Sequence, residues 1–371
     1  MPSRRIVHSS ALPLFMLAAL VLVSCGGFRL KSSTLRSYAE PGAGGSGIVL
    51  NLSRDQGSVM GTWEDPSLSR YGVVEGDAKA DATFSLRFYA SNTEAPVGTL
   101  QGSWIKGESR MKGVLQFGGG TPRDLELETA AAPTANLVSY SAYAESRKGL
   151  PKAESDPTRF YYFGFEPGSP AELRSWYRKT FQGGKDLRAA VATERDTFIK
   201  DFDATTKDRA AQMAPELLRP WYYEGRQFLS FRGKDLLVMG LRRGIYTGSE
   251  DMSQSLRYAV IDEKERTVLG PGDFLAAGWQ EALPALLAAS AREELGLAPD
   301  APLAENGLNS NTVSPSGDFF VYSKGMGFHY VPGKLAPAEA GEFFLLLPFD
   351  RLNGLVRPDV LARYGMSVSS R

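Results

Sequence analysis

The fold is decided by a pattern that occurs twice, as Val59-Met60-Gly61-Thr62-Trp63 and as Thr99-Leu100-Gln101-Gly102-Ser103-Trp104. Each copy ends in Gly, a hydroxyl residue and Trp after a strand-like run, and Met111–Phe117 is a shorter third version. Around these copies, residues 48 to 128 are rich in β-forming residues with a period of two and are divided by Gly, Asn and Asp turns. Repeated hairpins of this kind predict a small antiparallel β barrel or sandwich over residues 47–130.

The glycines and tryptophans of this pattern have a structural interpretation. Gly permits neighbouring backbones to approach closely where a strand bends, and Trp63 and Trp104 would fill the interior. We therefore expect a solid core. The alternative is a carrier in which both tryptophans line a pocket for a small apolar ligand, and it requires a cavity of roughly several hundred Å3.

The second part of the chain, residues 137–371, mixes strands and helices and is predicted to be an α+β domain. A link of small and polar residues at 129–136 precedes it. Ser169-Pro170-Ala171-Glu172 has the residues of a helix start with Ser as the N-cap, and Gly183-Gly184 would end that helix. The sheet is expected to be mainly antiparallel, with helices on one side. Further strands are predicted near 137–143, 159–165, 227–231, 235–246, 254–261, 267–269, 318–322, 327–331 and 342–347, and further helices after 187, at 279–296 and at 358–364.

The N-terminus has the features of a bacterial lipoprotein signal. Arg4 and Arg5 precede an apolar run from Ala11 to Val23, and the first 24 residues contain no Asp or Glu. That run is too short for a transmembrane helix, which needs about 20 residues, and it fits the core of a secretory signal. Leu22-Val23-Ser24-Cys25 supplies the lipobox, so cleavage after Ser24 would leave Cys25, the sole cysteine, to be acylated.

Acylation of Cys25 determines the expected location. Residues 1–24 would be removed, residues 25–46 would form a lipidated flexible tether, and the protein would be held at a membrane outside the cytoplasm. Gly26 after the anchor suggests the outer membrane if the cell is Gram-negative. Without other cysteines there are no disulfides, so stability comes from core packing. Removing the signal leaves a net charge of −2, which argues against a nucleic-acid partner.

Catalytic residues are sparse. His8 leaves with the signal, so the mature chain has His329 as its one histidine, in an aromatic strand where such a residue is usually packed. The residue counts exclude zinc sites built from His and Cys, and the sequence has no phosphate-binding Gly loop. We therefore expect no enzymatic activity, metal or cofactor. A glycan hydrolase that uses two carboxylates is the remaining catalytic alternative, with Glu250-Asp251 and Glu293-Glu294 as the visible pairs.

The order of motifs in the second part resembles a bacterial envelope domain. This domain occurs in RsiV-type anti-sigma factors, which sense lysozyme, and ahead of the catalytic domain of PdaC-type peptidoglycan deacetylases. Tyr246-Thr247-Gly248-Ser249 stands where the family has Tyr-Thr-Gly-Gly-Ala-His-Gly, and the remainder of that motif differs here, ending in Glu250-Asp251-Met252. The resemblance covers residues 137–355 and continues through Tyr258–Asp262, Gly272–Leu275, Val313–Gly317, Phe319–Tyr322 and Gly341–Phe349.

The resemblance implies an α+β fold and a binding role in the envelope, without catalysis. The predicted function is a non-enzymatic, membrane-anchored module that binds a cell-wall glycan such as peptidoglycan, or an extracytoplasmic protein such as lysozyme. Exposed aromatic rings stack on sugars and anchor protein interfaces. The expected binding residues are Tyr246, Thr247, Gly248 and Ser249 of the loop, together with the aromatic residues Tyr322, Phe328 and Tyr330.

Overall fold

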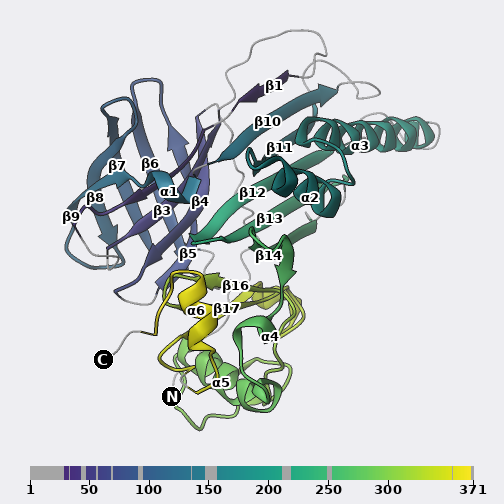
Figure 1. Cartoon of the computed structure of the whole chain (residues 1–371). Helices are drawn as coiled ribbons and strands as arrows, with labels where there is room; N and C mark the ends of the chain where they lie inside the picture. Colours follow the sequence, from purple (N-terminus) through teal and green to yellow (C-terminus); the bar gives the residue numbers. More distant parts are fainter. Residues whose placement is uncertain are drawn as a thin grey trace.

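A computed structural model shows a closed barrel, a seven-stranded sheet and a three-stranded sheet (Figure 1). The residues it describes are 29–32, 34–42, 47–55, 57–67, 70–90, 95–134, 136–146, 157–210, 219–248, 253–352 and 354–368. Ser24, Cys25 and the loop residues Ser249 to Met252 lie outside this set, so the predictions about them stay predictions. Within the described residues, no helix combines the length and the apolar character needed to cross a membrane.

The barrel has eight antiparallel strands that pair in chain order. Two residue pairs, Tyr38 with Thr129 and Ala39 with Glu128, join the first strand to the last and close it. Of the two predicted architectures, the barrel is therefore the one that forms. Its strands are β2 (Thr34–Ala39), β3 (Val49–Asp55), β4 (Ser58–Asp65), β5 (Arg70–Ala78), β6 (Thr83–Ala90), β7 (Gly98–Ile105), β8 (Arg110–Phe117) and β9 (Arg123–Thr129).

The prediction of a flexible tether over residues 25–46 is wrong for part of that range. β1 (Arg29–Ser32) and β2 both lie inside it. β2 is a wall of the barrel, whereas β1 pairs with a strand of the seven-stranded sheet. The Gly-rich composition that suggested flexibility is confined to residues 42–47, and the backbone groups of the preceding strands are paired in two different sheets. The first strand that the structure describes therefore begins only four residues after Cys25.

The glycines of the repeated pattern lie where neighbouring barrel strands nearly touch. A β-carbon on Gly61 would lie 1.7 Å from the carbonyl oxygen of Asn51, and one on Gly102 would lie 2.1 Å from that of Lys112. Any side chain at these positions would overlap the backbone of the adjacent strand. The prediction that Gly permits close backbone approach is confirmed at both sites.

Aromatic rings fill the barrel. Trp63 is 1% exposed, and its ring centroid lies 5.5 Å from that of Phe88 and 5.3 Å from that of Phe117. Trp104 packs against Phe84 with the centroids 4.6 Å apart. Each of the eight strands adds buried apolar side chains to this cluster. The interior is a solid core, and the space that an apolar ligand would need is occupied by side chains.

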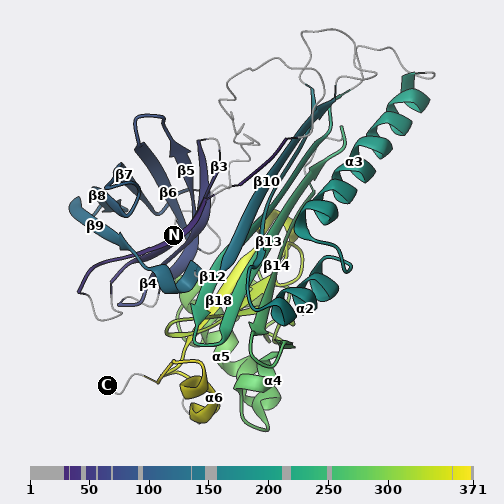
Figure 2. The same cartoon turned by 45° about the horizontal axis from the view of Figure 1, so that its top comes forward.

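The seven-stranded sheet is mainly antiparallel. Its order is β1-β10-β11-β12-β13-β14-β15, and β11 and β12 form its parallel pair. Parallel neighbours need a crossover connection, which contains α2 (Ala171–Phe181) and α3 (Leu187–Ala210). These helices lie on one side of the sheet and the barrel lies on the other (Figure 2). The remaining strands are β10 (Leu137–Ser146), β11 (Thr158–Pro167), β12 (Tyr222–Gly233), β13 (Leu236–Tyr246), β14 (Ser253–Asp262) and β15 (Thr267–Leu269); the short helix α1 (Ala131–Thr134) precedes β10.

The two crossover helices match the sequence prediction except at one cap. α2 ends before Gly183 and Gly184, as predicted, but its N-cap is Pro170 and no side chain caps it. Ser169 is therefore not the N-cap. The apolar stripe of α3 faces the sheet, where Phe202 is fully buried in a cluster of aromatic and aliphatic residues.

The three-stranded sheet completes the largest hydrophobic core. α5 (Trp279–Glu294) packs on β18 (Phe343–Pro348), and α4 (Pro271–Phe274) contacts α6 (Pro358–Arg363). Tyr71 of the barrel strand β5 also enters this core. The other two strands of the sheet are β16 (Phe319–Tyr322) and β17 (Gly325–Tyr330), and short 3-10 turns lie at Ala304–Asn306 and Ala338–Ala340.

A β-bulge at Ser230 joins the barrel to the seven-stranded sheet. The register of β12 against β13 shifts between Leu229 and Phe231, so Ser230 is left out of the ladder. Its carbonyl oxygen accepts a hydrogen bond from Asn51 Nδ2 at 3.2 Å, and its hydroxyl bonds to the Tyr71 hydroxyl at 2.8 Å. The carbonyl oxygen that the bulge leaves out of the ladder is thus satisfied by the barrel, and the Ser230 hydroxyl adds a second bond between the two parts.

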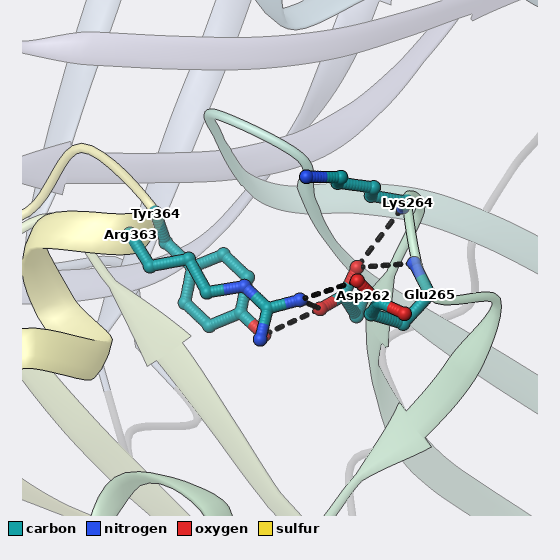
Figure 3. Close-up of polar contacts among 5 residues, drawn as sticks. All are labelled: Asp262, Lys264, Glu265, Arg363 and Tyr364. Atoms are coloured by element: carbon teal, nitrogen blue, oxygen red, sulfur yellow. Dashed lines mark hydrogen bonds and ion pairs between the residues drawn. The ribbon is translucent and has the colours of Figure 1, made fainter.

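Asp262 ties the C-terminal helix to the end of β14 (Figure 3). Its Oδ1 accepts the backbone N–H groups of Lys264 and Glu265, at 2.9 and 2.8 Å. Its Oδ2 accepts hydrogen bonds from Arg363 Nη2 at 2.6 Å and from the Tyr364 hydroxyl at 2.8 Å. A carboxylate can accept about four such bonds, so this buried residue is fully engaged in holding a turn and a helix.

Candidate functional site

The predicted binding loop starts at one end of the seven-stranded sheet. Tyr246, the last residue of β13, pairs with Tyr222, the first residue of β12. Following the pairing across the sheet shows that the N-terminal residue of β1 lies at this same end. We call it the Tyr246 end, and it is formed by the strand termini Arg29, Ser146, Thr158, Tyr222, Tyr246 and Ser253.

Three side chains from other elements surround Gly248. A β-carbon at Gly248 would lie 3.3 Å from Arg219 Cβ, 3.5 Å from Arg209 Nη1 and 3.8 Å from Trp221 Nε1. Arg209 belongs to the last turn of α3, whereas Arg219 and Trp221 belong to the segment that enters β12. The backbone φ of Gly248 is +82°, a conformation that favours glycine. Folding therefore brings the Arg209 guanidinium, the Trp221 indole and the base of the Arg219 side chain around the start of the loop.

A pair of stacked tyrosines lies at the same end of the sheet. The rings of Tyr222 and Tyr246 have centroids 5.7 Å apart and planes inclined by 26°. Both are half-buried, whereas Arg209 and Arg219 are exposed. Guanidinium groups bind carboxylates and phosphates through paired hydrogen bonds, and ring faces stack on sugars. We call the cluster the Tyr246 patch, which consists of Arg209, Arg219, Trp221, Tyr222, Tyr246, Thr247 and Gly248.

Glu194 of α3 organises the polar side chains beside the patch. It accepts a hydrogen bond from the Tyr223 hydroxyl and pairs with Arg243 Nη2 at 3.2 Å. Partial burial would lower the pKa of the Arg243 guanidinium, but the Glu194 carboxylate outweighs this and raises the pKa. The charge of Glu194 is therefore balanced within the protein by Arg243.

The prediction that Tyr322, Phe328 and Tyr330 are exposed binding residues is wrong. Their exposed fractions are 0%, 0% and 3%. Every residue of β16 and β17 is buried, because α5, β14 and the barrel residue Tyr71 pack around the three-stranded sheet. Aromatic residues in such a strand form the core and offer no surface to a ligand.

His329 is a core residue, as predicted. Its Nδ1 lies 2.7 Å from Asp318 Oδ2, and Asp318 Oδ1 accepts the backbone N–H of Tyr258 at 2.7 Å. Its Nε2 lies 3.4 Å from Glu342 Oε2, which is an ion-pair distance without hydrogen-bond geometry. In a catalytic triad, the second ring nitrogen faces a nucleophilic hydroxyl. Glu342 stands in that position here, so the arrangement is that of a buried charge cluster.

Carboxylates of the described residues form ion pairs and buried contacts that suit a structural role. Burial raises the pKa of Glu64 to about 7, but this side chain is sealed between the barrel and the β16–β17 hairpin, where Oε1 accepts the Ser323 N–H at 3.0 Å. Glu293 is exposed and pairs with Arg351, and Glu250-Asp251 lie outside the described residues. No cluster of three or more potential metal ligands occurs in the part of the chain that the structure describes.

Sequence reasoning found the loop but missed its neighbours. Arg209 and Arg219 are distant in sequence from Gly248 and carry no local motif. The one available signal is the aromatic run Trp221-Tyr222-Tyr223 at the start of a strand, and its contact with the loop depends on the pairing of β12 with β13.

Comparison with known proteins gives a fold without an activity. No protein-family model and no curated protein matches the sequence. Among solved structures, a DUF3298 family member from Bacteroides fragilis matches with a TM-score of 0.53 and 15% identity, over 61% of this chain and 97% of that chain. A DUF3298 family protein from Pseudomonas aeruginosa matches with a TM-score of 0.44 and 16% identity, over 64% and 100% of the two chains. The Bacteroides likeness shows a shared fold.

Proposed function

We propose that this protein is a non-enzymatic envelope lipoprotein, anchored through Cys25, that binds an anionic cell-wall glycan at the Tyr246 patch. The observation that carries the proposal is the convergence of Arg209, Arg219 and Trp221 on Gly248, at the end of the sheet where Tyr222 and Tyr246 stack. The ring faces supply stacking surfaces for sugars, and the guanidinium groups match carboxylate or phosphate substituents. The likeness of Tyr246-Thr247-Gly248 to the RsiV/PdaC module supports the same loop as the binding element.

The absence of catalysis is part of the proposal. Its support is the placement of the acid and base candidates within the described residues. His329 lies between two carboxylates in the core, and Glu64 is enclosed at an interface. Neither faces a cleft that could admit a glycan.

Binding is tested by titrating the detergent-purified mature protein with soluble peptidoglycan fragments. We expect Arg209→Ala combined with Arg219→Ala to weaken binding at least 10-fold, since charge-assisted hydrogen bonds are worth about 1.5–3 kcal/mol each. Arg123→Ala on the barrel rim, whose side chain is 50% exposed, is the matched control and should bind normally. Equal affinity of the double variant and the wild type would refute the patch. Binding to lysozyme in place of the glycan would make the partner a protein.

The anchor is tested separately. Mass spectrometry of the mature N-terminal peptide should show acyl chains on Cys25 and no residue of 1–24, and Cys25→Ala should abolish both the processing and detergent partitioning. The soluble fragment for such work has to retain β1 and β2, so it must start before Arg29.

A further inference from the structure

We infer that the lipid anchor holds the Tyr246 end of the sheet against the bilayer, so that the ligand of the Tyr246 patch is a glycan linked to a membrane lipid through phosphate. The inference rests on the proposed function, because it takes the acylation of Cys25 and a glycan-binding patch as its premises. It adds the orientation of the molecule and the chemical class of the ligand.

The anchor has a short covalent reach. Residues Gly26, Gly27 and Phe28 separate Cys25 from Arg29, the first residue of β1. A chain extends at most about 3.6 Å per residue, so Arg29 lies within roughly 14 Å of the anchored residue. A flexible tether of 22 residues would have left the folded protein free to rotate relative to the membrane. The three-residue link between Cys25 and Arg29 restricts that rotation.

The register of the sheet places the patch at the end that the anchor reaches. Arg29 pairs with Tyr143 near the end of β10, and the pairing of β10 to β13 places Tyr246 at that same end. The opposite end is far away, because β14 runs from Ser253 to Asp262. At about 3.3 Å per residue, those two residues are roughly 30 Å apart. The patch is therefore on the membrane side, and the Asp262 turn is distant.

The chemistry of the patch suits a ligand at that depth. Tyr and Trp favour the level of lipid headgroups, and arginine binds phosphate with paired hydrogen bonds. Within the patch, Arg209 and Arg219 are exposed, and the Tyr222–Tyr246 pair at the same end of the sheet is half-buried. A sugar on the tyrosines and a phosphate on the arginines would use both groups together. Plain anionic phospholipid would use only the arginines.

Orientation is tested with introduced thiols, since Cys25 is the one native cysteine and is acylated in the premise. Ser253→Cys and Lys264→Cys are exposed positions at the two ends of β14. With a fluorophore on each and the mature protein in nanodiscs that contain spin-labelled headgroups, we expect the Ser253 label to be quenched at least 2-fold more than the Lys264 label. Equal quenching, or stronger quenching at Lys264, would overturn the inference. Loss of acyl chains in the mass spectrum would instead point to failure of the proposed function.

The ligand is tested by native mass spectrometry of the mature protein in three nanodiscs: zwitterionic lipid alone, with phosphatidylglycerol, and with a polyprenyl-pyrophosphate-linked disaccharide. We expect a retained adduct of the third lipid that falls at least 10-fold in the Arg209→Ala, Arg219→Ala double variant and persists in Arg123→Ala. Equal retention of phosphatidylglycerol would reduce the site to an anionic membrane contact and overturn the ligand class. Binding of soluble glycan fragments with no lipid-linked adduct would leave the proposed function intact and remove this inference.

Discussion

His329 Nδ1 lies 2.7 Å from Asp318 Oδ2 in a core where the imidazole has no exposed surface. Burial alone would lower the pKa of His329, but the carboxylates of Asp318 and Glu342 outweigh it and raise the pKa above 6.5. Burial would raise the pKa of Glu342, yet His329 brings it below 4.5. Since Asp318 also binds the Tyr258 N–H, this charge cluster links the two open sheets.

His329→Leu should destabilise the protein most in mildly acidic solution. A histidine with a raised folded pKa contributes stability below its unfolded pKa of 6.5 and loses it as the pH rises through the folded value. Glu342 contributes stability above its unfolded pKa of 4.5, and this stability is lost as the pH falls through the lowered pKa of the folded state. Breaking a buried pair costs about 3–5 kcal/mol, so denaturant unfolding should show a loss of that order near pH 5.5 and a smaller loss at pH 9. The control, Tyr330→Phe, should cost about 1 kcal/mol at both pH values. A pH-independent effect of His329→Leu would contradict the charged pairing.

Glu64→Gln should stabilise the protein in alkaline solution. The raised pKa, about 7 against 4.5, means that stability falls as the pH rises from about 4.5 to about 7, because the carboxyl ionises in the unfolded chain before it ionises in the folded one. Gln keeps an oxygen for the Ser323 N–H but has no charge to bury. Because each pKa unit corresponds to 1.36 kcal/mol, we expect a gain of roughly 3 kcal/mol at pH 9 and little change at pH 4. Glu305→Gln, an exposed acid, is the control in the same melts. Destabilisation by Glu64→Gln at pH 9 would show that the buried Glu64 carboxylate stabilises the fold and would contradict this prediction.

Tyr71→Ala should weaken the hydrophobic core around the three-stranded sheet, although the residue belongs to the barrel. Its ring lies 4.7 Å from Phe320 and its hydroxyl bonds to Ser230. Large-to-small changes of this kind cost about 3–5 kcal/mol, and Tyr71→Phe should cost about 1 kcal/mol through the lost hydrogen bond. Calorimetry should show one cooperative transition shifted downward. Val114→Ala, at an exposed barrel position, should leave the transition in place. Two separated transitions in the wild type would mean that barrel and sheets unfold independently.

Gly61→Ala should disrupt the barrel. The added methyl would lie 1.7 Å from the Asn51 carbonyl oxygen, and neither strand can move without breaking the ladder. We expect a loss of about 3 kcal/mol or more, at the upper end of overpacking effects. Gly119→Ala at a hairpin tip, where nothing lies within 4 Å, should be nearly neutral. Similar melting temperatures for the two variants would disprove the role given to the close approach.

Local patterns were sufficient for most elements, because their signals are local. The period of two over residues 48–128 predicted strands such as β6, and a helix was predicted after residue 187, where α3 is present. The register of β1 with β10 could not be predicted, since that pairing joins residues separated by the entire barrel. For the same reason, aromatic residues of β16 and β17 gave no indication that Tyr71 would cover them.

The candidate site shows the same division. Tyr246-Thr247-Gly248 stood out as a motif, whereas Arg209 and Arg219 became part of the patch only through the packing of α3 and the pairing of β12. Residues that are brought together only by folding have no characteristic separation along the chain, so a single sequence does not reveal them.

One consequence concerns the history of the chain. β1 and β10 are adjacent antiparallel strands, and the barrel occupies the position that a hairpin turn would normally have. A domain inserted into a turn leaves the surrounding sheet uninterrupted, since both ends of the insertion connect to neighbouring strands. We therefore expect related chains without the barrel, in which a few residues join the counterparts of residues 32 and 137. In those chains, other side chains have to cover the surface that Tyr71 and Asn51 cover in this protein.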